Sequence, residues 1–434
     1  MPNPTRITCR TPVIALVPLL VAVSLCSSCT TDVPDAPVAG ARVTDSTGVA
    51  LVHNASAIVD TSRALEEVLR IGVINGPEWQ QFHQIRGITL DAMGRIYVAD
   101  GGSQSIRVFD AGGNYVRTIG SSGNGPGEFT GLGPIGVWRD TVYANARNGL
   151  VELFFDTAGT YLGTRMARLP EGARLGILGA TPTGWLVEEV GPRRSGDPVP
   201  GMEEFYATIR RVQARDFADA AASRAAADSL MSPVAQYRHR RVFWHQRAGG
   251  ARLTRQTPFF EPVGFSAVDG RGRVHVAAGW PYRIDTYDTN GKLLRRVSRA
   301  HDSIPVDPFV AEGIARAEAH YSSTAGSSDI FRWRASLPRV GWLPVTGEIF
   351  AAREGELWVQ RIDLMPDPAS RVWVTSTALL ARTVWDVLDP DGILRYSVLL
   401  PPGFDMRAVQ PGTAIGIQRD ENDVQYVVKY VVRS

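Results

Sequence analysis

The chain has 434 residues, of which 44% are hydrophobic, so it can bury a sizeable core, and this argues against global disorder. Its 43 glycines and 28 prolines favour a turn-rich, all-β protein over a helical one. Lysine and arginine number 46 against 44 acidic residues and are interspersed with them, so no nucleic-acid-binding surface is expected.

Residues 1–29 have the pattern of a bacterial export signal. Arg6 and Arg10 precede an apolar stretch, residues 12–25, that is shorter than the roughly 20 residues a membrane-spanning helix needs. Small residues then precede Cys29 in a segment that resembles a bacterial lipobox, which implies a lipid on the Cys29 thiol. Cys26 departs from the lipobox pattern, because it stands where a leucine is expected. Ordinary secretory cleavage near the same place is the alternative.

A polar tether is predicted for residues 30–46, which are rich in Pro, Ala, Asp and Thr. The three cysteines all precede it, so the folded part is expected to contain neither a disulfide nor a reactive thiolate. We expect an exported protein with a lipid anchor in the cell envelope. The outer membrane is preferred, because Thr30 and Thr31 lack the aspartate that retains some lipoproteins at the inner membrane.

A repeat of short strands fills residues 47–434. Its clearest copy, residues 86–120, has four apolar segments of four to six residues separated by turns rich in Gly and Asn, which is typical of an antiparallel meander. One such sheet cannot bury both of its faces, so the copies are expected to stack as propeller blades. Five weaker copies follow, at residues 135–165, 175–212, 263–297, 348–400 and 406–432.

The last copy has only three strands, and its fourth is expected from the N-terminal end. Residues 68–72, followed by Asn75-Gly76-Pro77, parallel residues 116–120, followed by Asn124-Gly125-Pro126. A strand near residues 68–72 therefore completes the sixth blade and leaves no open sheet edge there. The prediction is an all-β protein, a six-bladed β-propeller of four-stranded antiparallel blades with short helical insertions. A seventh blade would have to come from residues 216–260, which read poorly as one.

These segments also resemble a known family. Residues 94–100 (GRIYVAD) and 106–110 (IRVFD) resemble NHL-type repeats. Residues 45–433 as a whole are similar to a group of bacterial six-bladed propeller lipoproteins, through residues 48–54, 123–129 and 385–392. The resemblance implies the fold and carries no reaction.

We hypothesise that four insertions form a lid over one face of the ring. Residues 191–203 and 363–382 fall between second and third strands, and residues 299–345 join blades four and five. Residues 308–318, within the last of these, and residues 215–231 have the composition or spacing of short helices. The alternative is that these insertions are decorations without a binding role.

A ligand site is expected where the innermost strands begin, at the face that carries the loops between second and third strands. Five residues are candidates there. Glu261 and Asp405 could hold a hard cation, Arg86 and Arg174 could bind a carboxylate or phosphate, and Trp280 could stack a ring. In propeller lactonases several carboxylates and amides hold a calcium ion, and two acids among two arginines match this poorly. No metal site is therefore predicted, calcium stays open, and otherwise the charges pair with one another or with the lid.

Catalytic motifs are scarce. The sequence has no Gly-x-Ser-x-Gly elbow, no HExxH and no phosphate loop. His275 and Asp100 lie in predicted strands and are expected to be structural, and residues 238–241 are expected to form a solvated hairpin. We therefore favour a binding or scaffold module for a protein, peptide or glycan, without predicting catalysis. The alternative is an enzyme at the channel opening, a lactonase-like hydrolase or a lyase.

Overall fold

The structure, a computed structural model, describes residues 40–55, 63–166, 174–181, 184–192, 199–213, 226, 229–246, 253–258, 261–306, 341–362 and 384–433. The predicted signal, Cys29, most of the tether and most of the four insertions lie outside these residues. No helix among the described residues is long and apolar enough to cross a membrane.

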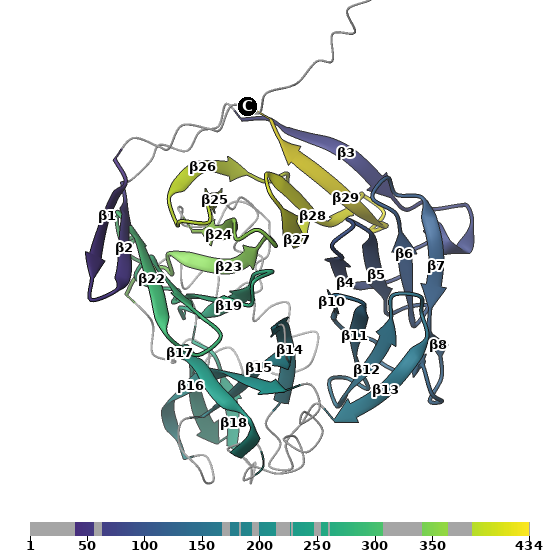
Figure 1. Ribbon diagram of the computed structural model, residues 1–434, viewed down its shortest axis with the longest axis horizontal. Helices are drawn as coiled ribbons and strands as arrows, with labels where there is room; N and C mark the ends of the chain where they lie inside the picture. Colours follow the sequence, from purple (N-terminus) through teal and green to yellow (C-terminus); the bar gives the residue numbers. More distant parts are fainter. Residues whose placement is uncertain are drawn as a thin grey trace, which may run out of the picture. The chain divides into compact units, whose positions relative to one another are not determined.

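Six antiparallel sheets form the blades of a β-propeller (Figure 1). Their innermost strands, β4, β10, β14, β19, β23 and β27, contact one another in this order, and β27 returns to β4. The closed ring confirms the prediction of six blades. Blade one consists of β4 (Ile85–Leu90), β5 (Ile96–Asp100), β6 (Ser105–Phe109) and β7 (Tyr115–Ile119). Blade two consists of β10 (Ile135–Trp138), β11 (Thr141–Ala146), β12 (Val151–Asp156) and β13 (Tyr161–Met166). Blade three consists of β14 (Arg174–Thr181), β15 (Gly184–Pro192), β16 (Gly201–Gln213), β17 (Ser232–Gln246) and β18 (Leu253–Gln256).

The remaining blades use strands from both ends of the chain. Blade four consists of β19 (Phe265–Val268), β20 (Val274–Ala277), β21 (Arg283–Tyr287) and β22 (Leu293–Arg299), extended by β2 (Val49–Asn54) and β1 (Arg42–Ser46). Blade five consists of β23 (Thr346–Ala351), β24 (Leu357–Arg361), β25 (Val384–Leu388) and β26 (Leu394–Leu399). Blade six consists of β27 (Phe404–Gln410), β28 (Thr413–Arg419), β29 (Gln425–Val432) and β3 (Leu65–Ile71). A one-turn helix, η1 (Glu78–Gln80), and a two-stranded pair, β8 (Ser121–Ser122) and β9 (Glu128–Phe129), lie between the sheets in the chain.

The closure of the ring follows the sequence prediction. Strand β3 pairs antiparallel with β29, with Ile71 opposite Val427 and Leu65 opposite Val432. Strand β3 thus completes the last blade and covers the edge of β29, which would otherwise be free to pair with another chain.

One turn recurs between strands and has a simple physical basis. An aspartate begins it, and its carboxylate accepts hydrogen bonds from the backbone N–H groups two and four residues later. The fourth residue is a glycine at positive φ, for example Gly94 at 76° and Gly272 at 78°. The turn begins at Asp91, Asp110, Asp269, Asp288 and Asp389.

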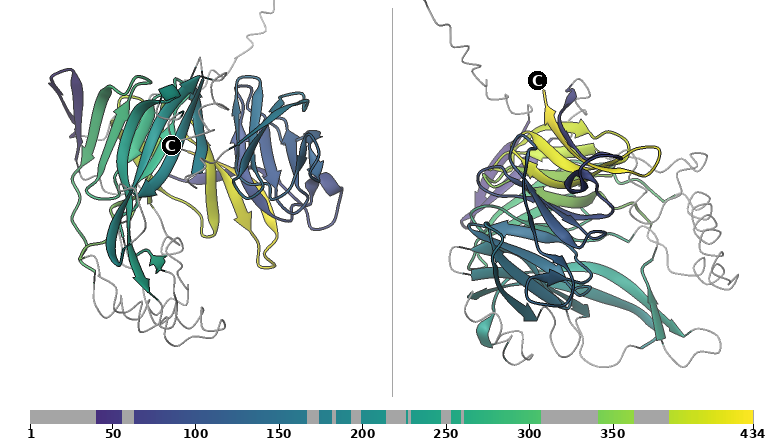
Figure 2. Two further views of the ribbon diagram at one scale, coloured as in Figure 1. Left: turned by 90° about the horizontal axis from the view of Figure 1, so that it is seen from below. Right: turned by 90° about the vertical axis from the view of Figure 1, so that its right-hand side faces the viewer.

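The two faces of the ring differ in what connects the strands. The turns between first and second strands, such as residues 91–94, 269–272 and 352–355, lie on what we call the turn face. The connections between second and third strands, such as residues 101–104 and 278–282, and those between blades lie on the opposite loop face. In Figure 2 the long strands of blade three extend beyond those of the other blades.

The core lies between neighbouring blades. Apolar side chains of adjacent sheets interdigitate there, and Trp185, Trp358 and Trp385 are buried, as expected for tryptophans that pack between blades. This burial of apolar surface is the main source of stability for a ring without disulfides.

Two expectations about strands need correction. Arg42–Ser46, part of the predicted tether, is strand β1, and the β1–β2 hairpin adds to blade four through parallel pairing of β2 with β22. Residues 232–256 give blade three its fourth and fifth strands, so residues 238–241 lie within β17 and do not form a solvated hairpin. Parallel pairing without a tight turn leaves little trace in a sequence.

The single lid is also incorrect. The insertion at residues 214–231 joins third strand β16 to fourth strand β17 and therefore leaves from the turn face. The other three leave from the loop face, since they follow second or fourth strands.

Candidate functional site

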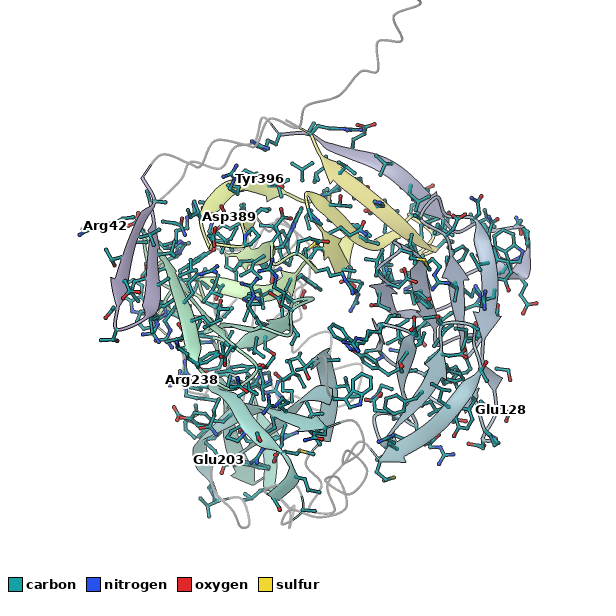
Figure 3. The ribbon with its side chains drawn as sticks, in the orientation of Figure 1. Arg42, Glu128, Glu203, Arg238, Asp389 and Tyr396 are labelled. Carbon is teal, nitrogen blue, oxygen red and sulfur yellow. The ribbon has the colours of Figure 1, made fainter. Side chains whose placement is uncertain are left out.

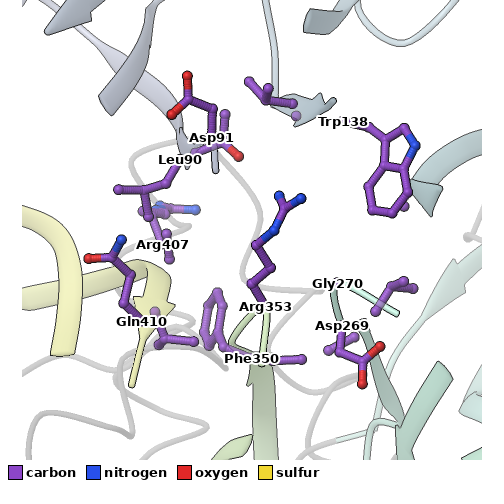
Figure 4. A pocket seen from close by; sticks show the side chains of 18 of the residues that line it. Leu90, Asp91, Trp138, Asp269, Gly270, Phe350, Arg353, Arg407 and Gln410 are labelled. Carbon is purple, nitrogen blue, oxygen red and sulfur yellow. The ribbon is translucent and has the colours of Figure 1, made fainter. Parts of the chain in front are cut away.

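A cavity of about 630 Å³ lies on the axis of the ring, toward the turn face. All six blades line it with residues from the innermost strands and the turns that follow them, including Leu90, Trp138, Leu178, Val268, Phe350 and Gln410 (Figure 4). A volume of this size is in the range of small-molecule sites. It is at the opposite face from the one where the sequence predicted a site.

The two aspartates that line the cavity form hydrogen bonds with residues in or near their own turns. Asp91 accepts bonds from Arg95 Nε at 2.5 Å and from the Tyr97 hydroxyl at 3.2 Å. Asp269, in the equivalent turn of blade four, accepts from Arg273 Nε at 2.6 Å and lies 3.4 Å from His275 Nε2. Burial acts to raise the pKa of Asp269, but His275 and Arg273 outweigh it, so this pKa is lowered. Both carboxylates therefore have a structural role and are not free to bind a cation.

Arg353 is the prominent cation of the cavity. It is exposed, comes from the turn of blade five, and extends into the cavity in Figure 4. Its Cζ lies 6.0 Å from the ring centroid of Trp138, which belongs to β10 of blade two. Because blades two and five are opposite each other in a ring of six, this pair spans the cavity.

The backbone under Arg353 is held by a close contact between turns. Gly270 N donates to the Arg353 carbonyl oxygen at 3.1 Å. A Cβ at position 270 would lie 2.4 Å from Arg353 Cγ and 2.6 Å from that oxygen, so only glycine fits. The turn of blade four thus positions Arg353.

A second polar group lies on the innermost strands β23 and β27. Arg407 forms an ion pair with Asp405, and Arg407 also lines the cavity. Burial and the neighbouring charge of Asp405 raise the pKa of Glu348, although Arg407 partly opposes this. Glu348 is therefore more readily protonated than an ordinary glutamate.

The structure places the predicted site residues on separate elements. Arg86 is exposed on β4, Trp280 is 44% exposed in the loop between β20 and β21, and Asp405 is paired with Arg407. Arg174 starts β14, and its side chain is outside the described part.

Glu261, one of the two candidates for holding a cation, is paired in the structure. Its carboxylate is buried and accepts a bidentate pair of bonds from Arg241, at 2.9 Å from Nε to Oε1 and 2.8 Å from Nη2 to Oε2, with Arg238 3.6 Å away. Both arginines lie on β17, and Figure 3 labels Arg238 away from the centre of the ring. The structure therefore supports the alternative, in which the charge of Glu261 is neutralised by an ion pair.

Two structural expectations are confirmed. Asp100 is fully buried, and its carboxylate accepts bonds from the backbone of Gly102 at 3.1 Å and Gln84 at 2.7 Å. His275 is 1% exposed, and burial lowers its pKa, so it is neutral at pH 7. In the described residues no group of three or more His, Cys, Asp or Glu side chains is placed to hold a metal ion.

Sequence reasoning missed Arg353 and Trp138. A signal existed, because Ala92, Gly270 and Arg353, at the second position of the inner turn in blades one, four and five, all line the cavity. Trp138, which lies opposite Arg353 across the ring, could not be identified from its spacing along the chain.

Comparison with known proteins agrees with the fold. A family model described as a 6-bladed beta-propeller matches residues 74–144. No curated protein matches the chain.

Several solved structures are similar in outline. A member of the DUF4221 family from Bacteroides vulgatus is 9% identical, covering 86% of this chain and 98% of its own, with a TM-score of 0.44. A gluconolactonase from Xanthomonas campestris is 11% identical, covering 86% and 100%, with a TM-score of 0.34. Virginiamycin B lyase from Staphylococcus aureus is 11% identical over the same shares, with a TM-score of 0.38. At these scores the similarities carry no argument about function.

Proposed function

We propose that the protein is a binding module whose central cavity on the turn face takes a small ligand. The observation that carries this proposal is the cavity itself, because all six blades line it and Arg353 and Trp138 face each other across it. Ligand sites of this kind are concave, with apolar walls and a few convergent polar groups. The ligand can be free or the end of a protein, peptide or glycan, as the sequence analysis expected.

A substitution of Ala92 is expected to close the cavity. Ala92 is exposed and lines it, so Ala92→Trp adds bulk at the opening without touching the core. Ligands found by a thermal-shift screen of the purified propeller should bind this variant at least about tenfold more weakly, measured by calorimetry, because a tenfold loss needs only about 1.4 kcal/mol.

The matched control is Ala111→Trp. Ala111 is the second residue of the outer turn of the same blade, is exposed, and does not line the cavity. It should bind as the wild type does. Equal binding by all three proteins would place the ligand elsewhere and overturn the proposal.

A second candidate function is catalysis at the polar group on β23 and β27, which reaches the cavity through Arg407, as a hydrolase of lactones or a lyase. Glu348 favours it, since a carboxyl with a raised pKa beside Asp405 and Arg407 is suited to proton transfer. Turnover of lactones or esters that disappears in Glu348→Gln would establish it. Turnover that is absent in the wild type, or unchanged in the variant, would eliminate this role for Glu348.

The location proposed for this module rests on residues outside the described part. Arg6, Arg10, the apolar residues 12–25 and Cys29 support export and a lipid anchor, with the outer membrane preferred. The mass of the N-terminal peptide of the mature protein decides it: a diacylated Cys29 supports the anchor, and an unmodified N-terminus contradicts it.

A further inference from the structure

Most charged side chains of the cavity form ion pairs. Asp91 pairs with Arg95, Asp269 pairs with Arg273, and Arg407 pairs with Asp405. Arg353 has no carboxylate partner among the described residues. It is the one lining cation, within the described part of the chain, whose charge is left for a ligand.

The other unpaired charge of the lining is Glu354, the next residue in the same turn. Its charge acts on Glu356 and contributes to the raised pKa of that carboxyl. Glu356 in turn accepts bonds from Trp358 Nε1 at 2.8 Å and from Gly412 N at 2.9 Å, which belongs to blade six. Among the described residues Arg353 and Glu354 form no ion pair with each other, and Arg353 lies near Trp138 of blade two.

The part of the cavity wall that Arg353 and Trp138 form suits an anion with a ring. A cation 6.0 Å from a ring centroid is at the outer limit of direct contact, so the two side chains do not satisfy each other. A guanidinium binds a carboxylate through two parallel hydrogen bonds, and an indole presents a flat apolar face to a ring. The guanidinium of Arg353 offers one positive charge, which fits a monoanion better than a phosphate dianion.

We infer that the ligand is a small carboxylate that carries a ring, with its carboxylate on Arg353 and its ring against Trp138. This inference rests on the proposed function and names its ligand class. Aromatic acids and sugar acids share this chemistry, and the cavity of about 630 Å³ admits either.

Calorimetry with two matched pairs of probes tests the inference on the purified propeller. The pairs are benzoate with benzamide and glucuronate with glucuronamide, in which only the charge changes. The wild type should bind at least one acid about tenfold more tightly than its amide. Stronger binding of benzoate identifies an aromatic acid, and stronger binding of glucuronate identifies a sugar acid.

The variant Arg353→Gln should lose this preference, with both members of the pair binding equally. Its control is Arg271→Gln, since Arg271 is also an exposed arginine in an inner turn but does not line the cavity. The control should keep the preference, and a thermal melt of each variant shows that the ring is intact. No preference in the wild type, or a preference that survives in Arg353→Gln, would overturn the inference.

The same variants separate this failure from failure of the proposed function. A neutral ligand that Ala92→Trp excludes but Arg353→Gln does not affect would leave the cavity as the binding site and refute the carboxylate class. A carboxylate that binds Ala92→Trp as tightly as the wild type would refute the cavity itself.

Discussion

Replacing Asp386 with asparagine is expected to lower the free energy of unfolding by about 3–5 kcal/mol. Asp386 is fully buried on β25, where Arg361 Nη1 donates to its carboxylate at 2.9 Å and Ser397 Oγ at 2.6 Å. Arg299, at the end of β22 in blade four, donates to the other carboxylate oxygen. The substitution keeps the shape of the side chain and removes the anion between two arginines that are 3% and 4% exposed. Removing a buried counter-charge is costly, and the ion pairs of Asp386 join blades four and five.

Chemical denaturation of the purified propeller measures this effect. The control is Asp423→Asn, which removes the partner of Arg419 in a pair whose side chains are 79% and 48% exposed. Exposed pairs contribute about 1 kcal/mol or less, so the control should be nearly as stable as the wild type. If the two variants lose the same amount of stability, the Asp386 pair is not a major link between the blades.

The fold could be predicted because its determinants are local. The recurring turn has an aspartate at its first position and a glycine at positive φ at its fourth in five places, as at Asp91 and Gly94, and this spacing is visible in the sequence. The closure of the ring could be predicted for the same reason, since the segment that ends at Ile71 repeats the one that ends at Ile119.

What could not be predicted depends on contacts between distant segments. The β1–β2 hairpin joins β22 by parallel pairing, which has no turn to mark it. Strand β17 contains Arg238, His239, Arg240 and Arg241, and their charge obscured the strand pattern. Burial of Glu261 against two of these arginines then removed the most promising cation ligand of the sequence analysis.

The cavity lies at the face opposite to the one that the sequence favoured, for a similar reason. Long insertions at the loop face suggested function there, because loops often carry binding residues. The described cavity is formed instead by short turns, whose second residues converge only when six blades close into a ring. Trp138 and Arg353 are more than two hundred positions apart in the sequence, and only the opposition of blades two and five brings them together.

A second large effect is expected at Glu152, whose burial should make stability depend on pH. Glu152 is 3% exposed on β12 of blade two. One carboxyl oxygen lies 3.1 Å from Asn145 Nδ2, and the other is buried with no hydrogen-bond partner among the described residues. Burial raises the pKa of Glu152 from 4.5 to about 7, and the bond from Asn145 offsets only part of this. The carboxyl is therefore largely protonated in the folded protein where an unfolded chain would already be ionised.

The sign of the effect follows from proton binding. Between pH 4.5 and about 7 the folded state holds a proton that the unfolded state has lost, so stability falls as the pH rises through this window and is level above it. Each pKa unit corresponds to about 1.4 kcal/mol, so the full loss attributable to Glu152 is about 3 kcal/mol.

The variant Glu152→Gln should remove this loss, because a neutral amide of the same shape has no proton to release. Its unfolding free energy, compared with that of the wild type at pH 5 and pH 8, should gain about 3 kcal/mol relative to the wild type at the higher pH. The control Glu421→Gln, at an exposed loop position, should follow the wild-type profile. A Glu152→Gln profile parallel to that of the wild type would mean that the carboxylate finds a counter-charge in the folded protein. Together with the Asp386 variant, this measurement separates two ways in which the interior treats charge: a carboxylate held between arginines stays ionised and joins blades, whereas one that faces only an amide is tolerated by keeping its proton.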